Sequence, residues 1–176
     1  MISKEDESTL KVLRATVSNT IKEISKTYDC IGYKILEVGP QPYEGLKETL
    51  KNASVDTLDI DPSSNCTYTA DLCCSNLDIP NNNYDVIMCT EVLEHTLNPF
   101  KAVDNLYKIL KKQGTILVTT PLNFRKHGPS PDCWRFTTDG LKSLFANFEK
   151  VEIQEIHNPE YSRFLFPAQL KLKAQK

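Results

Sequence analysis

Three acidic residues stand at or beside the carboxyl ends of short apolar runs, where they could hold a small ligand. Glu37 is followed about twenty residues later by Asp59, and Asp71 comes after the next apolar run. Carboxylates attract cations and accept hydrogen bonds from hydroxyl groups, but they repel a bare phosphate. With Gly39 allowing close approach of the backbone, this pattern predicts a nucleotide-like cofactor that carries a cation and hydroxyls.

A carboxylate and an imidazole follow the next apolar run, residues 84–89. In a helical turn Glu91 and His95 would be i, i+4 neighbours, so the carboxylate could orient the imidazole as a general base. The alternative is that Glu91 is an acid at a helix start and His95 is a structural residue that caps local backbone. The spacing leaves both open.

A third polar group lies in residues 121–136, a long segment rich in proline. Such loops are often functional. Here His127 is a second candidate base and Asp132 its orienting carboxylate. Trp134 and Arg135 suit the binding of a sugar, because rings pack on its apolar face and charged groups bind its hydroxyls. The alternative is that the aromatic residues anchor the loop to the core while Arg135 pairs with an acid.

Alternating strand and helix patterns must position these groups. We expect strands at 34–38, 55–60, 67–70, 84–89, 114–120 and 148–157, and helices at 5–27, 43–52, 98–112 and 138–146. Residues 164–166 would open a last strand that Pro167 limits. Buried Val, Ile and Leu strands alternating with helices predict an α/β fold, with an open, mostly parallel sheet covered by helices on both faces.

Composition excludes several classes of protein. The 176 residues hold 21 Lys+Arg against 23 Asp+Glu, a net charge of −2 that argues against a general nucleic-acid binder. The basic residues Lys171, Lys173 and Lys176 are interpreted as a solvated tail. No apolar run reaches the ~18 residues of a membrane span, and the N-terminus does not resemble a signal peptide. Six cysteines without a CxxC pair predict reduced thiols and a cytoplasmic protein rather than a zinc site.

Five stretches occur in order over residues 30–155: Leu36–Gly39, Leu58–Asp61, Ala70–Leu72, Tyr84–His95 and Gly114–Pro121. Together they resemble the small, Rossmann-like group of class I S-adenosylmethionine-dependent methyltransferases. The resemblance implies a Rossmann-like sheet and S-adenosylmethionine as cofactor. Residues 127–136 also resemble a segment of methyltransferases from polysaccharide and glycan gene clusters.

The resemblance also implies a role for each polar position. Residues near the methionine moiety would be Glu37, Gly39 and Pro40. The ribose would be held by Asp59, with Asp61 as the alternative, and the adenine by Asp71 and the backbone of Leu72. The sulfonium end would be bordered by Thr90 and Glu91.

One departure from the family pattern lies directly after Gly39. The family usually has further glycines there, whereas this chain continues Pro40-Gln41-Pro42-Tyr43. These side chains would crowd a cofactor that normally meets bare backbone. The fixed φ of proline would pre-set the turn in compensation.

We therefore expect one domain over residues 1–176, with an amphipathic helix at 1–29, a cofactor-binding core at 30–157 and a short C-terminal segment at 158–176. Its expected activity is O-methylation of a sugar or glycan precursor. Alternatives are N- or C-methylation of a small metabolite and a silent cofactor-binding module. Expected partners are a small-molecule or glycan acceptor, without nucleic acid, membrane or metal. Because no closing hairpin is evident, a homodimer or a larger multidomain protein is also expected.

Overall fold

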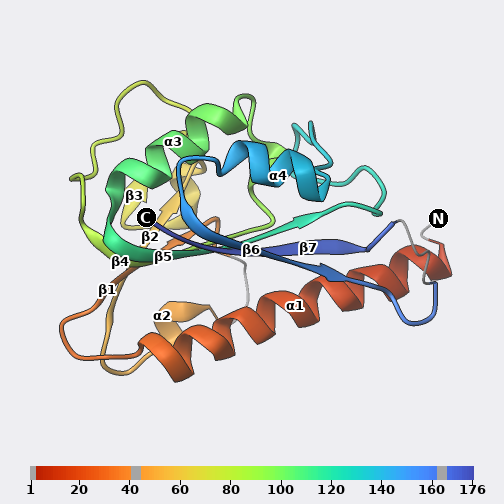
Figure 1. Ribbon diagram of the computed structural model, residues 1–176, viewed down its shortest axis with the longest axis horizontal. Coiled ribbons are helices and arrows are strands. Elements are labelled where there is room, and N and C mark those ends of the chain that lie inside the picture. Colours follow the sequence, from red (N-terminus) through yellow and green to blue (C-terminus); the bar gives the residue numbers. More distant parts are fainter. Residues whose placement is uncertain (1–2, 41–44, 162–165) are drawn as a thin grey trace.

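The computed structural model describes residues 3–40, 45–161 and 166–176, and within them seven strands form one sheet (Figure 1). The spatial order is β3-β2-β1-β4-β5-β7-β6. The strands are β1 (Lys34–Val38), β2 (Ser54–Asp59), β3 (Tyr68–Thr69), β4 (Tyr84–Thr90), β5 (Leu110–Pro121), β6 (Glu149–Ile156) and β7 (Gln169–Gln175). The first five strands are parallel, and β7 pairs antiparallel with both β5 and β6. This confirms the predicted mostly parallel α/β fold.

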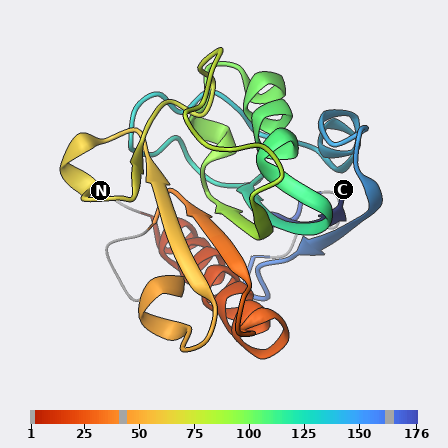
Figure 2. The ribbon, with the colours of Figure 1, turned by 90° about the vertical axis from the view of Figure 1, so that its left-hand side faces the viewer.

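Helices cover both faces of the sheet, as Figures 1 and 2 show. They are α1 (Lys4–Tyr28), α2 (Leu46–Thr49), α3 (Pro99–Ile109) and α4 (Thr138–Leu144), with short 3-10 turns η1 (Pro62–Ser64) and η2 (Leu93–His95). The long helix α1 lies under the sheet with α2 beside it, and α3 and α4 lie on the opposite face. In the described part of the chain, no helix has the length and apolar character needed to cross a membrane.

The two layers are held by alternate residues of the central strands. On β1, Ile35 packs with the α1 side and Leu36 packs with the α3 side, and both are fully buried. Successive side chains of a strand point to opposite faces, so an uninterrupted apolar run serves both layers. Helix α1 contributes Val17, Ile21 and Ile24 from one stripe, which is the amphipathic spacing read from the sequence.

Two helix ends differ from the prediction. The helix expected at 98–112 is α3, which ends at Ile109 because the chain continues directly into β5. The left-handed residue near the start of β5 is Gln113, with φ 64°. The helix expected at 43–52 is confined to Leu46–Thr49 in the described residues.

The C-terminal residues form a strand, so the interpretation of a solvated tail is wrong. In β7, Leu170, Leu172 and Ala174 are buried, while Lys171 and Lys173 alternate with them. This period-2 pattern is that of a strand, and β7 pairs with β6 as an antiparallel hairpin at the end of the sheet. Lys171 also donates a hydrogen bond to Glu23 of α1. The expected strand at 164–166 falls mostly outside the described residues.

Candidate active site

A cleft opens at the carboxyl ends of β1, β2 and β4, where the order of strands along the sheet reverses. Crevices of open α/β sheets bind ligands at this switch point. The cleft has a volume of about 240 Å³, and we call it the central cleft. Its lining residues are Val38, Gly39, Leu58, Asp59, Ile60, Ala70, Asp71, Leu72, Glu91, Val92, His95, Thr96, Leu97, Pro129 and Pro131.

Gly39 makes the turn at the end of β1. It has φ +65°, a region that favours glycine, and its N–H donates to the carbonyl of Leu58 at 2.8 Å. A Cβ at this position would lie 2.6 Å from Cγ2 of Val92. Only glycine therefore lets β1 and the segment after β4 approach this closely.

Asp59 and Asp71 both line the central cleft, and each is fixed by its own turn. One oxygen of Asp59 accepts the N–H of Asp61 at 2.8 Å, and one oxygen of Asp71 accepts the N–H of Cys73 at 2.8 Å. Leu97, from the segment after β4, lines the same cleft. The structure thus brings together two of the three acids predicted for one sheet edge.

Asp61 lies in a neighbouring depression rather than in the central cleft. Its Oδ1 accepts both the N–H and the hydroxyl of Ser63 at 2.8 Å, which caps η1 and lowers the pKa of Asp61. This depression of about 570 Å³, the outer hollow, adjoins the cleft at Asp59, Ile60 and Pro129. Of the two candidates for holding the ribose, Asp59 therefore lines the central cleft and Asp61 does not.

Glu37 also borders the outer hollow and is almost completely buried. Its carboxylate accepts the N–H of Leu46 at 2.9 Å and so holds the start of α2, while burial raises the pKa of Glu37. Pro40 lines the same hollow, whereas its successors Gln41, Pro42 and Tyr43 lie outside the described residues, so the predicted crowding stays a prediction.

The side chains of Thr90 and Leu72 are both buried. Thr90 is 1% exposed at the end of β4 and is not among the residues that line the central cleft. Leu72 does line the cleft, but its carbonyl accepts a hydrogen bond from the Asn105 side chain at 2.9 Å.

The apolar walls of the central cleft were not predicted. Ile60 is 67% exposed and Leu97 is 73% exposed, and both line the cleft. An exposed large apolar side chain beside a polar crevice is typical of a binding site for a flat ring. The sequence did hold one sign of this wall: an apolar residue, Ile60, stands between Asp59 and Asp61 at the end of a strand, where a polar turn residue is usual.

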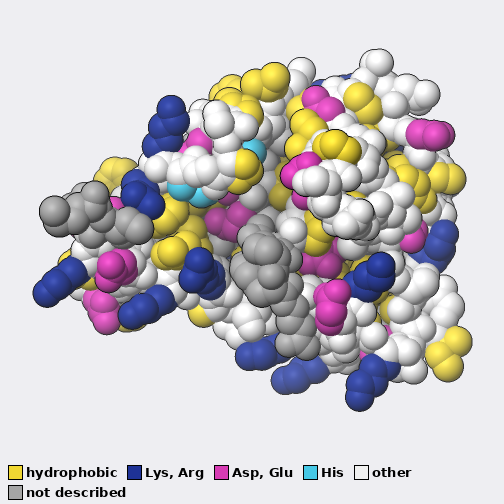
Figure 3. Space-filling view, turned by 180° about the vertical axis from the view of Figure 1, so that it is seen from behind, with side chains coloured by type: hydrophobic (Ala, Val, Ile, Leu, Met, Phe, Trp, Pro, Cys, Tyr) yellow, Lys and Arg dark blue, Asp and Glu magenta, His cyan; other side chains and the backbone are white. Residues whose placement is uncertain are grey.

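A second cavity of about 280 Å³, the α1 cavity, lies between α1 and the loop after β5. It is lined by Leu10, Leu13, Arg14, Val17, Glu91, His95, Phe124, His127, Gly128 and Pro129. It shares Glu91, His95 and Pro129 with the central cleft, so the two spaces meet there. Figure 3 shows histidine, acidic and hydrophobic side chains gathered near the middle of one face of the molecule.

The predicted pairing of Glu91 with His95 on a helical turn is wrong. Glu91 has φ 55°, and the turn after it is the 3-10 helix η2, so the two side chains are not stacked as i, i+4 neighbours. Instead, Oε1 of Glu91 accepts hydrogen bonds from Thr119 at 2.8 Å and Gln169 at 2.6 Å. Burial raises the pKa of Glu91 to about 7, although these two bonds lower it.

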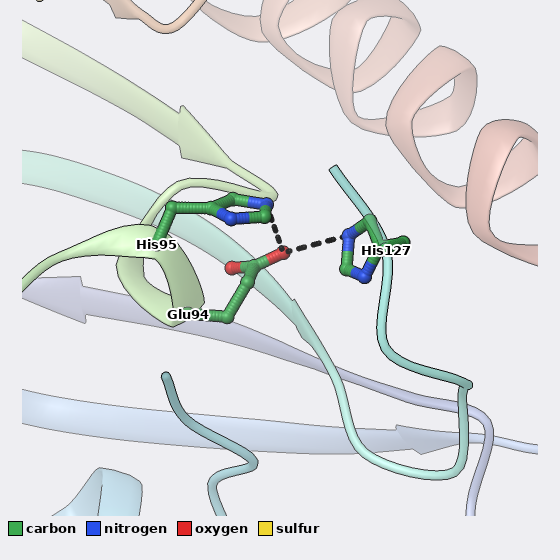
Figure 4. A group of neighbouring side chains, drawn as sticks. All are labelled: Glu94, His95 and His127. Carbon is green, nitrogen blue, oxygen red and sulfur yellow. Dashed lines mark ion pairs between the residues drawn. The ribbon is translucent and has the colours of Figure 1, made fainter. Parts of the chain in front are cut away.

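His95 and His127 face a different carboxylate, that of Glu94 (Figure 4). The Nε2 atoms of His95 and His127 lie 3.9 and 4.0 Å from Oε1 of Glu94, and the two rings meet edge to face with centroids 4.9 Å apart. Glu94 stands beside His95 in the sequence, but nothing there indicated that its side chain turns inward toward a residue more than thirty positions away. No metal site was expected, yet these three side chains are spaced as a group that could hold an ion.

His127 and Asp132 do come together as predicted from their loop. The N–H of His127 donates to Oδ2 of Asp132 at 2.8 Å, and Nδ1 of His127 lies 3.2 Å from the same oxygen. Burial lowers the pKa of His127, although the Asp132 carboxylate opposes that shift. Burial therefore favours the neutral form of the His127 ring.

Arg135 and Trp134 are engaged within the protein. Arg135 donates to both oxygens of Asp132, at 2.6 and 2.8 Å, and to the carbonyls of Phe124 and Arg125. The Trp134 ring donates to the carbonyl of Thr96 at 2.7 Å. Neither residue lines the central cleft or the α1 cavity, so the geometry favours the alternative in which both hold the loop.

Comparison with known proteins gives a family match over most of the chain. A family model described as a methyltransferase domain matches residues 10–163. No curated protein matches the sequence.

Solved structures of similar fold share little sequence with the chain. A SAM-dependent methyltransferase from Archaeoglobus fulgidus has a TM-score of 0.66 at 17% identity, with 94% of each chain covered. One from Aquifex aeolicus has a TM-score of 0.64 at 14% identity, covering 99% of this chain and 96% of that chain. The cyclase SpnF has a TM-score of 0.67 at 14% identity, covering 92% and 80%. At these identities the likeness concerns the fold.

Proposed function

The chain belongs to the methyltransferase domain family, and from this premise we propose that it transfers a methyl group from S-adenosylmethionine to a hydroxyl of a sugar or a related small polar acceptor. S-adenosylmethionine is the cofactor of the structural neighbours from Archaeoglobus fulgidus and Aquifex aeolicus, whose fold this chain shares. The chemistry of the central cleft fits the same cofactor.

The central cleft offers partners for the ribose, the adenine and the sulfonium of S-adenosylmethionine. The acids Asp59 and Asp71 accept hydrogen bonds from hydroxyl and amino groups, and Ile60 and Leu97 offer apolar walls to a flat ring. Carboxylates along the cleft also favour the sulfonium cation over a neutral thioether. The bound cofactor supplies the activated methyl group, and this chain orients it toward the α1 cavity.

The observation that carries the proposal is the junction of the two spaces at Glu91, His95 and Pro129. A hydroxyl acceptor in the α1 cavity would have its oxygen beside the imidazoles of His95 and His127. A hydroxyl must lose a proton during methyl transfer, and a neutral imidazole at this position can receive it. An amine acceptor would need no such group.

The apolar and charged lining of the α1 cavity narrows the acceptor. Leu10, Leu13 and Phe124 provide apolar surface, and Arg14 adds a cation at the rim. A sugar presents both an apolar face and hydroxyl groups, so it matches this combination. Trp134 and Arg135 are held by hydrogen bonds to Thr96 and Asp132, so they support the loop that closes the cavity rather than the acceptor itself.

Calorimetry and acceptor assays test the proposal. We expect the chain to bind S-adenosylmethionine and its demethylated product, and to methylate sugar hydroxyls rather than amines. His127→Ala should reduce the rate with a hydroxyl acceptor roughly 10²-fold and leave cofactor affinity unchanged. Absence of cofactor binding at high-micromolar concentration in a folded protein would overturn the proposal. A methylation rate of His127→Ala equal to that of the wild type would favour N-methylation.

A further inference from the structure

Glu94 has no hydrogen-bond partner where one is required. Its side chain is 0% exposed, and neither Oε1 nor Oε2 makes a hydrogen bond in the described part of the chain. Buried polar atoms in native proteins nearly always have a partner, and a carboxylate without one is among the most costly groups to bury. Something other than these protein atoms must therefore satisfy this carboxylate.

Two imidazole nitrogens face the same carboxylate. The Nδ1 of His95 lies 2.8 Å from the carbonyl oxygen of Pro131, which can only accept, so the proton of the neutral ring is on Nδ1. The Nε2 of His95 is then left with a lone pair, 3.9 Å from Oε1 of Glu94. A hydrogen bond from the second ring nitrogen to a carbonyl is the usual support of a metal-binding histidine.

His127 is oriented in a similar way by Asp132. Its Nδ1 lies 3.2 Å from Oδ2 of Asp132, closer than the 3.5 Å to Nη2 of Arg135, and the carboxylate favours the proton on that nitrogen. The Nε2 of His127 therefore also presents a lone pair, at 4.0 Å from the same Oε1 of Glu94. Two lone pairs and a carboxylate converge on one point without hydrogen-bonding one another.

We propose that Glu94, His95 and His127 bind one divalent transition-metal ion at the junction of the central cleft and the α1 cavity. The three ligand atoms lie within 4.8 Å of one another. Two ligand atoms of one ion can lie at most roughly 4.2 Å apart, which is twice a metal–nitrogen bond length. The two distances from Glu94 to the histidines fit this limit. A small side-chain movement suffices to bring the ligand atoms of His95 and His127 within it as well.

The ligand set indicates which ion is bound. Two neutral imidazoles and one carboxylate suit Zn²⁺, Co²⁺, Mn²⁺ or Fe²⁺, whereas Mg²⁺ and Ca²⁺ prefer oxygen ligands. The ion would neutralise the buried charge of Glu94. Three protein ligands leave at least one position of the ion free beside the α1 cavity, which is lined by His95 and His127, and an open position is typical of catalytic rather than structural sites.

The ion's role in the reaction rests on the proposed function, but its binding does not. An acceptor hydroxyl coordinated at an open position would have a lowered pKa and would release its proton to water. Its oxygen then forms a bond to the methyl carbon as the carbon–sulfur bond breaks, and the sulfonium becomes a neutral thioether. With the ion bound, His127 would hold the ion and the proton would pass to water; without the ion, the imidazole is the group that receives the proton, as proposed above.

Metal titration of the full chain, free of a histidine tag and treated with chelator, tests the proposal. We expect one equivalent of Co²⁺ to bind with the visible absorption of a nitrogen- and oxygen-ligated ion, and Zn²⁺ to compete for it. Glu94→Gln, which keeps the side-chain volume, should weaken Co²⁺ binding by at least about 100-fold. His127→Ala should do the same, whereas His157→Ala, an exposed histidine beside Glu155, should bind as the wild type does.

Calorimetry with S-adenosylhomocysteine on the chelated proteins separates this proposal from the proposed function. Glu94→Gln should keep its cofactor affinity, which also establishes that it folds. A wild-type protein that binds S-adenosylhomocysteine but binds Co²⁺ no better than Glu94→Gln does would overturn the metal site alone. A protein that binds Co²⁺ through these residues but not the cofactor would overturn the proposed function and leave the metal site standing.

Discussion

At the β1–β2 end of the central cleft, Asp59 and Asp71 are each fixed by an N–H group two residues further along the chain. At the α1 end, by contrast, Glu94 and His127 come from segments separated by β5 and meet only in the folded protein. The first arrangement is local and satisfies its own hydrogen bonds. The second leaves the buried carboxylate of Glu94 without a hydrogen-bond partner among the residues that the structure describes. The comparison suggests that the cofactor end is set by turn chemistry and the acceptor end by tertiary packing.

The largest effect is expected at the turn of the cofactor end. Gly39→Ala should lower the free energy of unfolding by about 3 kcal/mol, because it adds left-handed strain and a clash with Val92. Gly32→Ala is a matched control, since its φ is +88° but nothing lies within 4 Å of the added Cβ. It should cost only about 1 kcal/mol. Urea denaturation measures both, and equal losses would show that the approach of Val92 does not matter.

Asp132→Asn tests whether the acceptor end depends on long loop contacts. Asp132 accepts two hydrogen bonds from Arg135 and one from the His127 N–H, so its loss should lower the free energy of unfolding by about 2 kcal/mol. The hydrogen bonds from Arg135 chiefly lower the pKa of Asp132. A lowered pKa means that the carboxylate stabilises the fold above its unfolded pKa and loses that effect as pH falls. The difference from wild type should therefore hold at pH 5–8 and shrink below about pH 4.

The exposed Asp139, which lies 3.9 Å from Lys142, provides the control. Asp139→Asn should change stability by less than about 0.5 kcal/mol at any of these pH values. A similar loss for both variants would mean that Asp132 is no more than a surface charge.

Substitutions of Asp59 and Asp61 test which of the two acids binds the cofactor. Asp59→Asn should weaken binding of S-adenosylhomocysteine by about 10-fold, because a charged acceptor of hydrogen bonds is lost from the cleft. Asp61→Asn should change affinity by less than about 3-fold, since Asp61 caps η1 and lines only the outer hollow. Isothermal calorimetry decides, and the reverse ranking would place the ribose against Asp61.

The smallest effect is expected far from both ends. Glu23 bonds to Lys171 at 2.7 Å and Lys173 at 3.1 Å and links α1 to β7. Burial alone would raise the pKa of Glu23, but these two lysines hold it below its usual value. Glu23→Gln should therefore cost about 0.5–1 kcal/mol near neutral pH, and the cost should shrink progressively below about pH 4, as urea denaturation over this pH range can measure. A loss comparable to that of Asp132→Asn would contradict the ranking.

Prediction from sequence succeeded where a feature is encoded locally. The apolar runs of β1 and β4 are buried on both faces, so their composition alone indicates a parallel sheet. Sequence-based prediction failed for β7, because a stretch in which Leu170 and Leu172 alternate with lysines is equally compatible with a charged, solvated tail. Only pairing with β5 and β6 turns that alternation into a buried strand.

At the acceptor end, local spacing led to the wrong partner. The i, i+4 relation of Glu91 and His95 assumes helical backbone, but the φ of 55° at Glu91 turns its side chain toward Thr119 and Gln169. Trp134 and Arg135 were candidates for the acceptor because of their chemistry. Their hydrogen bonds to Thr96 and Asp132 depend on how the loop folds back, which no residue pattern specifies.

The sequence by itself determined the α/β fold, the existence of the five parallel strands and the positions of Gly39, Asp59 and Asp71 at or just after their carboxyl ends, since hydrophobic period and turn chemistry act over a few residues. Tertiary structure alone decided that Glu94 faces inward and that His95 and His127 meet it. Those contacts join η2 to the loop after β5, and the side-chain directions there follow from the packing of the loop rather than from residue spacing.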